Sequence, residues 1–211
     1  MVRSESTTKL GGSRIGGPPD LPSSFAWPHH EHGPYQFLAQ INFADVPSGG
    51  TSLPSKGLLS LFHAHDPEEH VFFTEPEFIH AEWFPDETDL VATESPCADD
   101  DNGFPITFSP TVDLPFGRYQ VGVWPFSDDE GDLYWSLWKS LHATTDHLLG
   151  YPVAGSLGYN PSPGPDWDLL LNLYSHEDMY WSWCDGGHLM LFIEQHRLAV
   201  TDFSKIRCEA G

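Results

Sequence analysis

The sequence predicts an α+β protein made mostly of antiparallel β-sheets, built from two weakly duplicated units with a few helices. Short apolar runs bounded by the 19 glycines and 19 prolines favour buried strands over long helices. The main apolar runs recur at a nearly constant offset, which indicates an internal repeat. Only residues 133–147 show a clear helical periodicity. Sheets joined by turns, with helices in a minor role, follow from these three patterns.

The repeat has three landmarks, each of which occurs twice. The strongest is an apolar run with an amide in its middle, Gln40 in the first copy and Asn172 in the second, 132 positions later. The paired segments are residues 37–43 and 169–175, the Gly-led runs 57–62 and 187–192, and the Gly-x-Pro segments 16–18 and 150–152. We therefore expect one domain over residues 11–211, with unit one at about 11–62, an insert at about 63–146 and unit two at about 147–208.

The other elements are assigned from local pattern. Residues 72–73, 106–108 and 119–124 are expected to be further strands. A helix is expected from Leu133 to about His147, with acids at its positive end and an apolar stripe. The stripe consists of Leu133, Leu137, Trp138 and Leu141. Residues 24–28 and 160–165 are expected to be turns or loops, and residues 1–10 to be a loose N-terminus.

The charge is strongly acidic and unevenly distributed. The formal net charge is −22, of which residues 63–146 carry −17 and residues 1–62 carry none. Such a chain lacks the lysines and arginines that bind phosphates, so nucleic acid and anionic membrane surfaces are excluded as partners. Two acidic runs lie in the middle segment: Asp99, Asp100 and Asp101, and Asp128, Asp129 and Glu130 with Asp132. They are expected to be either a solvated surface or a docking face for a basic protein.

Compartment and cofactor follow from what the sequence lacks. No N-terminal apolar run of signal-peptide length and no stretch near the ~20 apolar residues of a membrane span is present. Three cysteines without a Cys-x-x-Cys spacing argue against disulfides and against a cysteine-based zinc site. We therefore expect a reduced, cytoplasmic protein without a cofactor, of unknown oligomeric state.

The landmarks resemble the YwqG-like family, a bacterial domain of unknown function. The resemblance covers about two thirds of the chain, in the same order, and rests on residues 16–22, 27–28, 37–42, 53–58, 147–152, 168–171, 183–193, 202–204 and Cys208. Two positions depart from the family pattern, because Asn172 stands in place of Gln and Cys184 in place of Gly. The resemblance implies an α+β fold without an established reaction, and an immunity-type role by the association of some relatives with toxin genes.

The two amides have two interpretations. A buried amide has to satisfy its hydrogen bonds, so Gln40 and Asn172 are expected to hold the backbone of a crossing loop, such as the Gly-Pro segment of their own unit. Alternatively, they form a pocket between the units for a small polar ligand. Asp185, next to Trp183 and before Gly186-Gly187, is typical of a tight turn.

The histidines supply the one candidate metal site. His63 and His65 point to one face of a strand, and His70 follows with Asp66, Glu68 and Glu69 nearby. The longer signatures of metal hydrolases are absent, so solvated loop histidines are the competing interpretation. The leading hypothesis is a non-enzymatic binding protein whose acidic face engages a basic protein. A metal-dependent hydrolase at the histidines and a small-ligand sensor at the amides are the alternatives.

Overall fold

The computed structural model describes residues 1–4, 9–49, 51–65, 70–97, 103–121, 123–141 and 146–211. The strands are β1 (Val2–Arg3), β2 (Arg14–Gly16), β3 (Asp20–Pro22), β4 (His29–His30), β5 (Gly33–Asn42), β6 (Leu58–Ala64), β7 (Ile79–Phe84), β8 (Leu90–Ala92), β9 (Gly103–Thr107), β10 (His147–Leu148), β11 (Trp167–Tyr174), β12 (His188–Glu194) and β13 (Ile206–Ala210). The helices are α1 (Asp128–Leu141) and α2 (Gln195–Leu198), with short 3₁₀ turns η1 (Phe43–Asp45), η2 (Arg118–Gln120) and η3 (Glu177–Met179).

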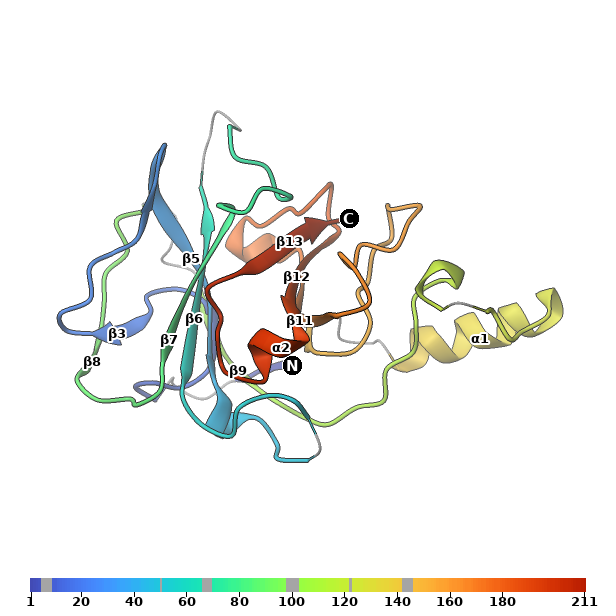
Figure 1. Cartoon of the computed structure of the whole chain (residues 1–211), viewed down its shortest axis with the longest axis horizontal. Helices are drawn as coiled ribbons and strands as arrows, with labels where there is room; N and C mark the ends of the chain where they lie inside the picture. Colours follow the sequence, from blue (N-terminus) through green and yellow to red (C-terminus); the bar gives the residue numbers. More distant parts are fainter. Residues whose placement is uncertain (5–8, 50, 66–69, 98–102, 122, 142–145) are drawn as a thin grey trace.

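The strands form three sheets, and every pairing among the described residues is antiparallel. A seven-stranded sheet has the order β1-β9-β2-β5-β6-β7 with β4 beside β5. A four-stranded sheet has the order β10-β11-β12-β13, and β3 pairs with β8. The two larger sheets lie side by side while α1 stands away from both (Figure 1). The predicted fold class, α+β with antiparallel sheets dominant, is confirmed.

The four-stranded sheet repeats the pairing found in the middle of the larger sheet. In the set β2-β5-β6-β7, Gln40 of β5 lies opposite Arg14 and Ser60. In the set β10-β11-β12-β13, Asn172 of β11 lies opposite His147 and Met190. The register of both long strands shifts at the corresponding place, between Phe37 and Ala39 in β5 and between Leu169 and Leu171 in β11. The two sets therefore match in strand order, in register and in the position of a bulge.

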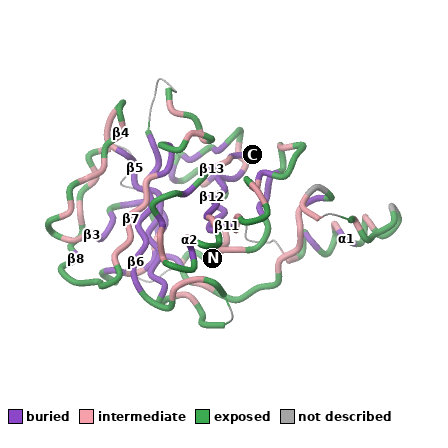
Figure 2. Tube along the Cα trace, in the orientation of Figure 1, coloured by how far each residue is buried: buried purple, intermediate pink, exposed green. Residues whose placement is uncertain are grey.

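The bulge decides which side chains reach the other sheet. Because side chains alternate along a strand, one extra residue reverses the facing of everything beyond it. One face of β6 meets the second half of the chain, and it carries every second residue, Leu59, Leu61 and His63. On this face the centroid of the His63 ring lies 5.4 Å from that of Trp183. One apolar cluster contains residues of both sheets, and the buried stretches follow β5, β6, β11 and β12 (Figure 2).

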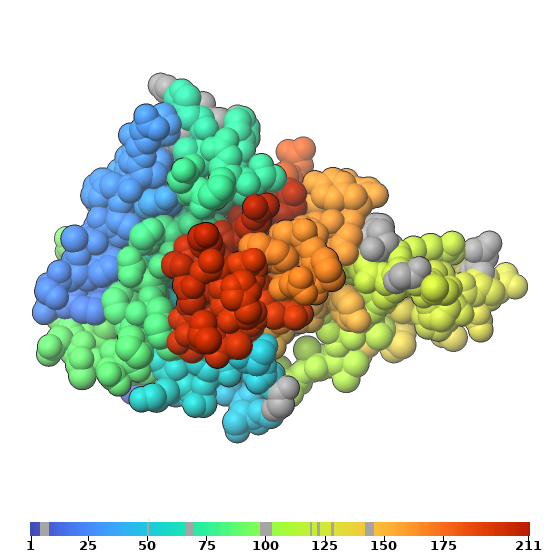
Figure 3. Space-filling view, in the orientation of Figure 1, coloured from blue at the N-terminus to red at the C-terminus, as the bar shows by residue number. Residues whose placement is uncertain are grey.

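An arm, defined as residues 113–121 and 123–141, projects from the sheets (Figure 3). Its helix α1 begins after Ser127, whose N–H and hydroxyl donate to Glu130 Oε2 at 2.8 and 2.7 Å, so the carboxylate makes the contact to the N-cap N–H that is typical of a capping box. Tyr134 and Trp138 are buried among aromatic side chains, whereas Leu133 is 74% exposed. The helix thus starts five residues before the predicted position and ends at Leu141.

The predicted apolar stripe of α1 is therefore correct at Trp138, which is buried, and wrong at the two leucines before it. Leu133 and Leu137 face solvent, and the row Tyr134–Trp138 faces the arm's own core. The aromatic row is buried because the Tyr134 hydroxyl and the Trp138 indole N–H donate to the carbonyls of Pro115 and Leu114.

Two predicted strands are also wrong. Residues 72–73 lie in turns before β7 begins at Ile79. In the segment 119–124, the described residues include the end of η2 rather than a strand, and Trp124 packs on Tyr134 with ring centroids 4.7 Å apart. The predicted strand at 106–108 corresponds to the end of β9. At the N-terminus, Val2–Arg3 form β1, which pairs with β9.

Candidate functional site

Gln40 joins the Gly-Pro segment of its own half to β5. The Asp20 N–H donates to Gln40 Oε1 at 2.9 Å, and Gln40 Nε2 donates to the Gly12 carbonyl at 2.8 Å. Asp20 is itself buried and pairs with Arg14 Nη2 at 3.0 Å, while burial lowers the pKa of Arg14 despite that carboxylate. Both ends of the amide are therefore engaged in holding the loop.

In the other half, Asn172 joins β11 to the backbone that follows the Gly-Tyr-Pro segment and to the side chain of His188. The Val153 N–H, next to the Gly-Tyr-Pro segment, donates to Asn172 Oδ1 at 3.1 Å. Asn172 Nδ2 donates to His188 Nδ1 at 2.9 Å, so the His188 ring is neutral. Burial lowers the pKa of His188 to about 4, followed by the effect of nearby His147. Each amide is fully buried and bonds within its own half, which matches the loop-holding interpretation of both residues.

Asp185 lies in the exposed turn between the η3 region and β12. Cys184, Asp185 and Gly186 all have positive φ, at 42°, 61° and 93°, and the Gly187 N–H donates to the Trp183 carbonyl at 2.6 Å. Trp183 itself is buried on the inner side of the turn, and its backbone N–H donates to Ser175 Oγ at 2.8 Å. The turn therefore fixes the position of the Trp183 indole.

The structure does not gather the three histidines proposed as metal ligands around one point. His63 is buried at the end of β6, and His65 is exposed just beyond it. His70 instead stacks on His32, with ring centroids 4.6 Å apart. No group of three or more potential ligands lies together among the described residues, while Asp66, Glu68 and Glu69 lie outside that part of the chain.

The predicted acidic face is only partly described. Asp99, Asp100 and Asp101 lie outside the described residues, as does the side chain of Asp128. Asp129 and Asp132 are exposed on the first turns of α1. The hydrogen bonds from Ser127 lower the pKa of Glu130, which therefore carries a structural role as the cap. Leu133 and Leu137 lie on the same exposed side as Asp129, at successive four-residue intervals.

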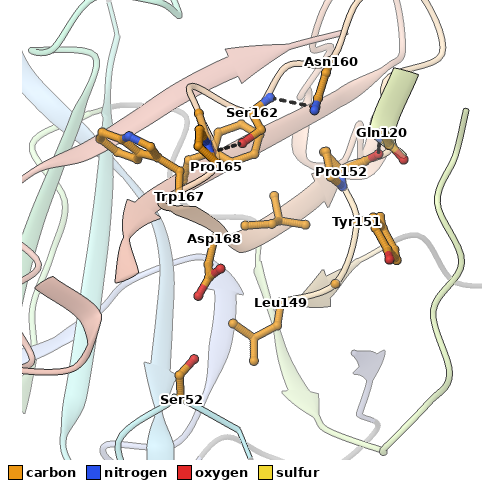
Figure 4. Close-up of a pocket in the computed structure, with 14 residues that line it drawn as sticks. Ser52, Gln120, Leu149, Tyr151, Pro152, Asn160, Ser162, Pro165, Trp167 and Asp168 are labelled. Atoms are coloured by element: carbon orange, nitrogen blue, oxygen red, sulfur yellow. Dashed lines mark hydrogen bonds between the residues drawn. The ribbon is translucent and has the colours of Figure 1, made fainter. Parts of the chain in front are cut away.

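A cavity of about 650 Å³ lies on the outer side of β11 (Figure 4). Several of its polar groups already bond to one another. The Ser162 N–H donates to Asn160 Oδ1 at 3.1 Å, and Gln120 Nε2 donates to the Pro152 carbonyl at 2.6 Å. Asp168 Oδ1 accepts a hydrogen bond from Gln195 at 2.9 Å. These polar groups of the lining are thus hydrogen-bonded within the protein and do not specify the hydrogen-bonding groups of a ligand.

A second cavity, of about 360 Å³, lies where the first sheet meets the segment 179–183 before β12 and is called the seam cavity below. It is lined by Gln36, His63, Ala64, His65, Val71, Phe72, Phe73, Phe78, Met179, Tyr180, Trp181, Ser182 and Trp183. The first sheet contributes the ends of β5 and β6, and the second half contributes the segment from Met179 to Trp183. It brings together three residues singled out from the sequence, His63, His65 and Trp183.

Two buried nitrogens in the lining of the seam cavity have no hydrogen-bond partner among the described residues, His63 Nε2 and Trp183 Nε1. His63 Nδ1–H donates to the Ala64 carbonyl at 3.2 Å, so in the neutral ring Nε2 is an acceptor. Burial is the main cause that lowers the pKa of His63 to about 4. A buried polar group without a partner costs about 1–3 kcal/mol, so a ligand that pairs with these two atoms would recover part of that free energy on binding.

Sequence reasoning missed most of this lining. Trp181 and Trp183 are two positions apart and flank the cavity together, with centroids 5.5 Å from one another, but they lie about 120 positions from His63. The spacing of the two tryptophans was the available signal, since alternate residues of an extended segment point to one side. No local pattern connects them to β6.

The chain belongs to the family described as Domain of unknown function (DUF1963), whose model matches residues 13–210. No curated protein gave a match to the chain. Among the described helices, none has the length and apolar character needed to cross a bilayer.

Proposed function

We propose that this chain is a non-enzymatic, cytoplasmic binding protein whose arm engages a basic protein. Within its family we assign it to the YwqG-like members on the motifs given above. That assignment adds an immunity-type role, in which the basic partner is a toxin held by steric and electrostatic occlusion.

The exposed side of α1 supports the proposal most directly. Leu133 and Leu137 are 74% and 49% exposed, one turn apart, although the same helix buries its other row. Asp129 and Asp132 are exposed at the N-terminal end of that surface. Exposed apolar side chains bordered by charge are typical of protein-binding surfaces.

The charge of the middle segment supports a basic partner. Residues 63–146 carry −17, and a field of one sign accelerates the encounter with an oppositely charged protein. The leucines then supply apolar contact once the partner has docked. In this mechanism the carboxylates govern the association rate, and the leucines govern the dissociation rate.

Native mass spectrometry of the full chain, purified at low salt from its own host, tests the first step. The expected species is a complex with a basic polypeptide. Association of that polypeptide is then measured with Asp129→Asn/Asp132→Asn, and with Glu87→Gln/Asp166→Asn as a control that removes two exposed charges elsewhere.

We expect the arm variant to associate several-fold more slowly and with a weaker salt dependence, while the control changes little. Leu133→Ser/Leu137→Ser should mainly accelerate dissociation. Equal association rates and salt dependence for the arm variant and the control would exclude the arm as the docking surface.

A further inference from the structure

We propose that the seam cavity binds a small uncharged planar heterocycle that presents a hydrogen-bond donor beside an acceptor. The volume of about 360 Å³ lies in the range of small-molecule sites, about 300–1,000 Å³. None of its lining residues belongs to the arm, so the site is independent of the surface proposed for a protein partner.

The polar groups specify the hydrogen-bonding character of the ligand. Within the part of the chain that the structure describes, Trp183 Nε1–H is a donor without a partner and His63 Nε2 is an acceptor without one. The Gln36 amide in the same lining adds one donor and one acceptor. A group that only donates, such as an ammonium, leaves the indole unpaired, and a group that only accepts leaves the imidazole unpaired. An amide-like edge satisfies both, after a small turn of the two buried rings.

The walls specify the shape. The Trp183 ring meets the His63 ring edge to face at 5.4 Å, and Trp181 lies 5.5 Å from Trp183. On the first-sheet side, Phe73 and Phe78 meet at 5.0 Å. Flat aromatic surfaces on more than one side favour a planar ring, which can stack or meet them edge to face.

The charge of the site favours a neutral ligand. Its described lining contains no Lys, Arg, Asp or Glu, and the His63 imidazole is neutral at physiological pH. A net charge of −22 on the chain also opposes an anion. Phosphorylated or carboxylated forms of such a ring are therefore expected to bind more weakly than the ring itself.

Titration followed by ¹H–¹⁵N NMR of the tryptophan indoles tests the inference on the full chain. Uracil and nicotinamide are the neutral probes, and benzoate and benzylamine are the charged ones. The Trp183 indole signal is identified by its loss in Trp183→Phe. We expect millimolar uracil or nicotinamide to move that signal, and the charged probes to leave it in place.

Two variants distinguish the site from general binding. His63→Phe and Trp183→Phe each keep an aromatic ring and remove one hydrogen-bonding nitrogen, so each should weaken binding of the neutral probe about tenfold. His188→Phe replaces a second buried neutral histidine, outside this cavity, and should leave the affinity unchanged. In Trp183→Phe the titration is followed at the indole signal of Trp181, which lines the same cavity, and this result decides the question if His63→Phe fails to fold.

The inference is overturned if neither neutral probe moves the Trp183 signal, if the charged probes move it equally, or if His188→Phe loses as much affinity as the cavity variants. The substitutions Asp129→Asn/Asp132→Asn should not alter the titration. A failure of the proposed protein partner is thereby distinguishable from a failure of this site.

Discussion

Replacing Gln40 by methionine tests whether the amide holds the first half together. Methionine is similar in length and flexible, so it fills the space while removing all hydrogen bonds of the amide. The Asp20 N–H is then left buried without its 2.9 Å acceptor, and the half-buried Gly12 carbonyl loses its 2.8 Å donor. At about 1–3 kcal/mol for a fully buried group and less for the second, the expected loss of unfolding free energy is about 3 kcal/mol.

Urea unfolding followed by tryptophan fluorescence measures this loss. With a slope of about 2 kcal/mol/M, the midpoint should fall by about 1.5 M. Gln195→Met is the matched control, because Gln195 is exposed and its 2.9 Å bond to Asp168 competes with water. The control should change the unfolding free energy by less than about 0.5 kcal/mol. Equal shifts for the two variants would refute the role assigned to the Gln40 amide.

Three further predictions concern pH, the arm and a close strand contact. The two buried histidines whose pKa is about 4 are neutral in the folded state, so the unfolded chain binds more protons below its histidine pKa of about 6.5. The free energy of unfolding should therefore be at its full value well above pH 6.5 and should fall by about 2 kcal/mol for each histidine between pH 7 and 5. Urea midpoints that stay constant over this range would contradict the prediction. Trp138→Ala should destabilise the arm by about 3 kcal/mol and reduce the helical circular dichroism. Leu137→Ala should change the free energy of unfolding by less than about 0.5 kcal/mol. Equal effects of the two variants would contradict the assignment of Trp138 to the buried side of the helix and Leu137 to the exposed side. Gly103→Ala places its Cβ 2.3 Å from the Gly16 carbonyl carbon and should lower the melting temperature sharply or prevent folding. The control is Gly131→Ala in α1, where no described atom lies within 4 Å of the new Cβ, and it should raise the free energy of unfolding by about 0.5–1 kcal/mol. A Gly103→Ala protein as stable as the wild type would disprove the close approach of β2 and β9.

The strands of the repeat could be read from the sequence because their signal is local. Apolar runs between breakers occupy residues 37–43, 57–62, 169–175 and 187–192, and each overlaps most of one strand, β5, β6, β11 or β12. The amides inside them could also be interpreted, since a fully buried polar side chain has few options besides a loop backbone.

The arm could not be read in the same way. Leu133 and Leu137 are four residues apart, as are Tyr134 and Trp138, so periodicity alone does not say which row is buried. The choice depends on the carbonyls of Leu114 and Pro115, which accept from the aromatic row and come from another segment. The start of the helix was readable, because Ser127 and Glu130 have the spacing of a capping box.

The candidate site needed the three-dimensional structure for a related reason. His63 belonged to a pattern that favours metal binding, but the pattern does not report that the ring is buried against Trp183 and that His70 lies beside His32. Contacts across about 120 positions depend on how the two sheets pack, and no spacing within either half encodes that packing.

The bulges in β5 and β11 have a consequence for how the gene can change length. Each long strand consists of two half-strands of opposite facing joined at a single extra residue, Leu38 or Leu170. Because the residues on either side of it pair with adjacent residues of the next strand, removing that codon would leave both half-strands in register, whereas gaining or losing a codon within a half-strand would shift it against its partner and exchange its core and outer side chains. Adding codons to the turn after Pro47 would leave both faces intact. Insertions and deletions are therefore expected to be tolerated in the connections and at the two bulges and excluded from the half-strands, where the pairing of Gln36 with His63 keeps both residues at the seam cavity.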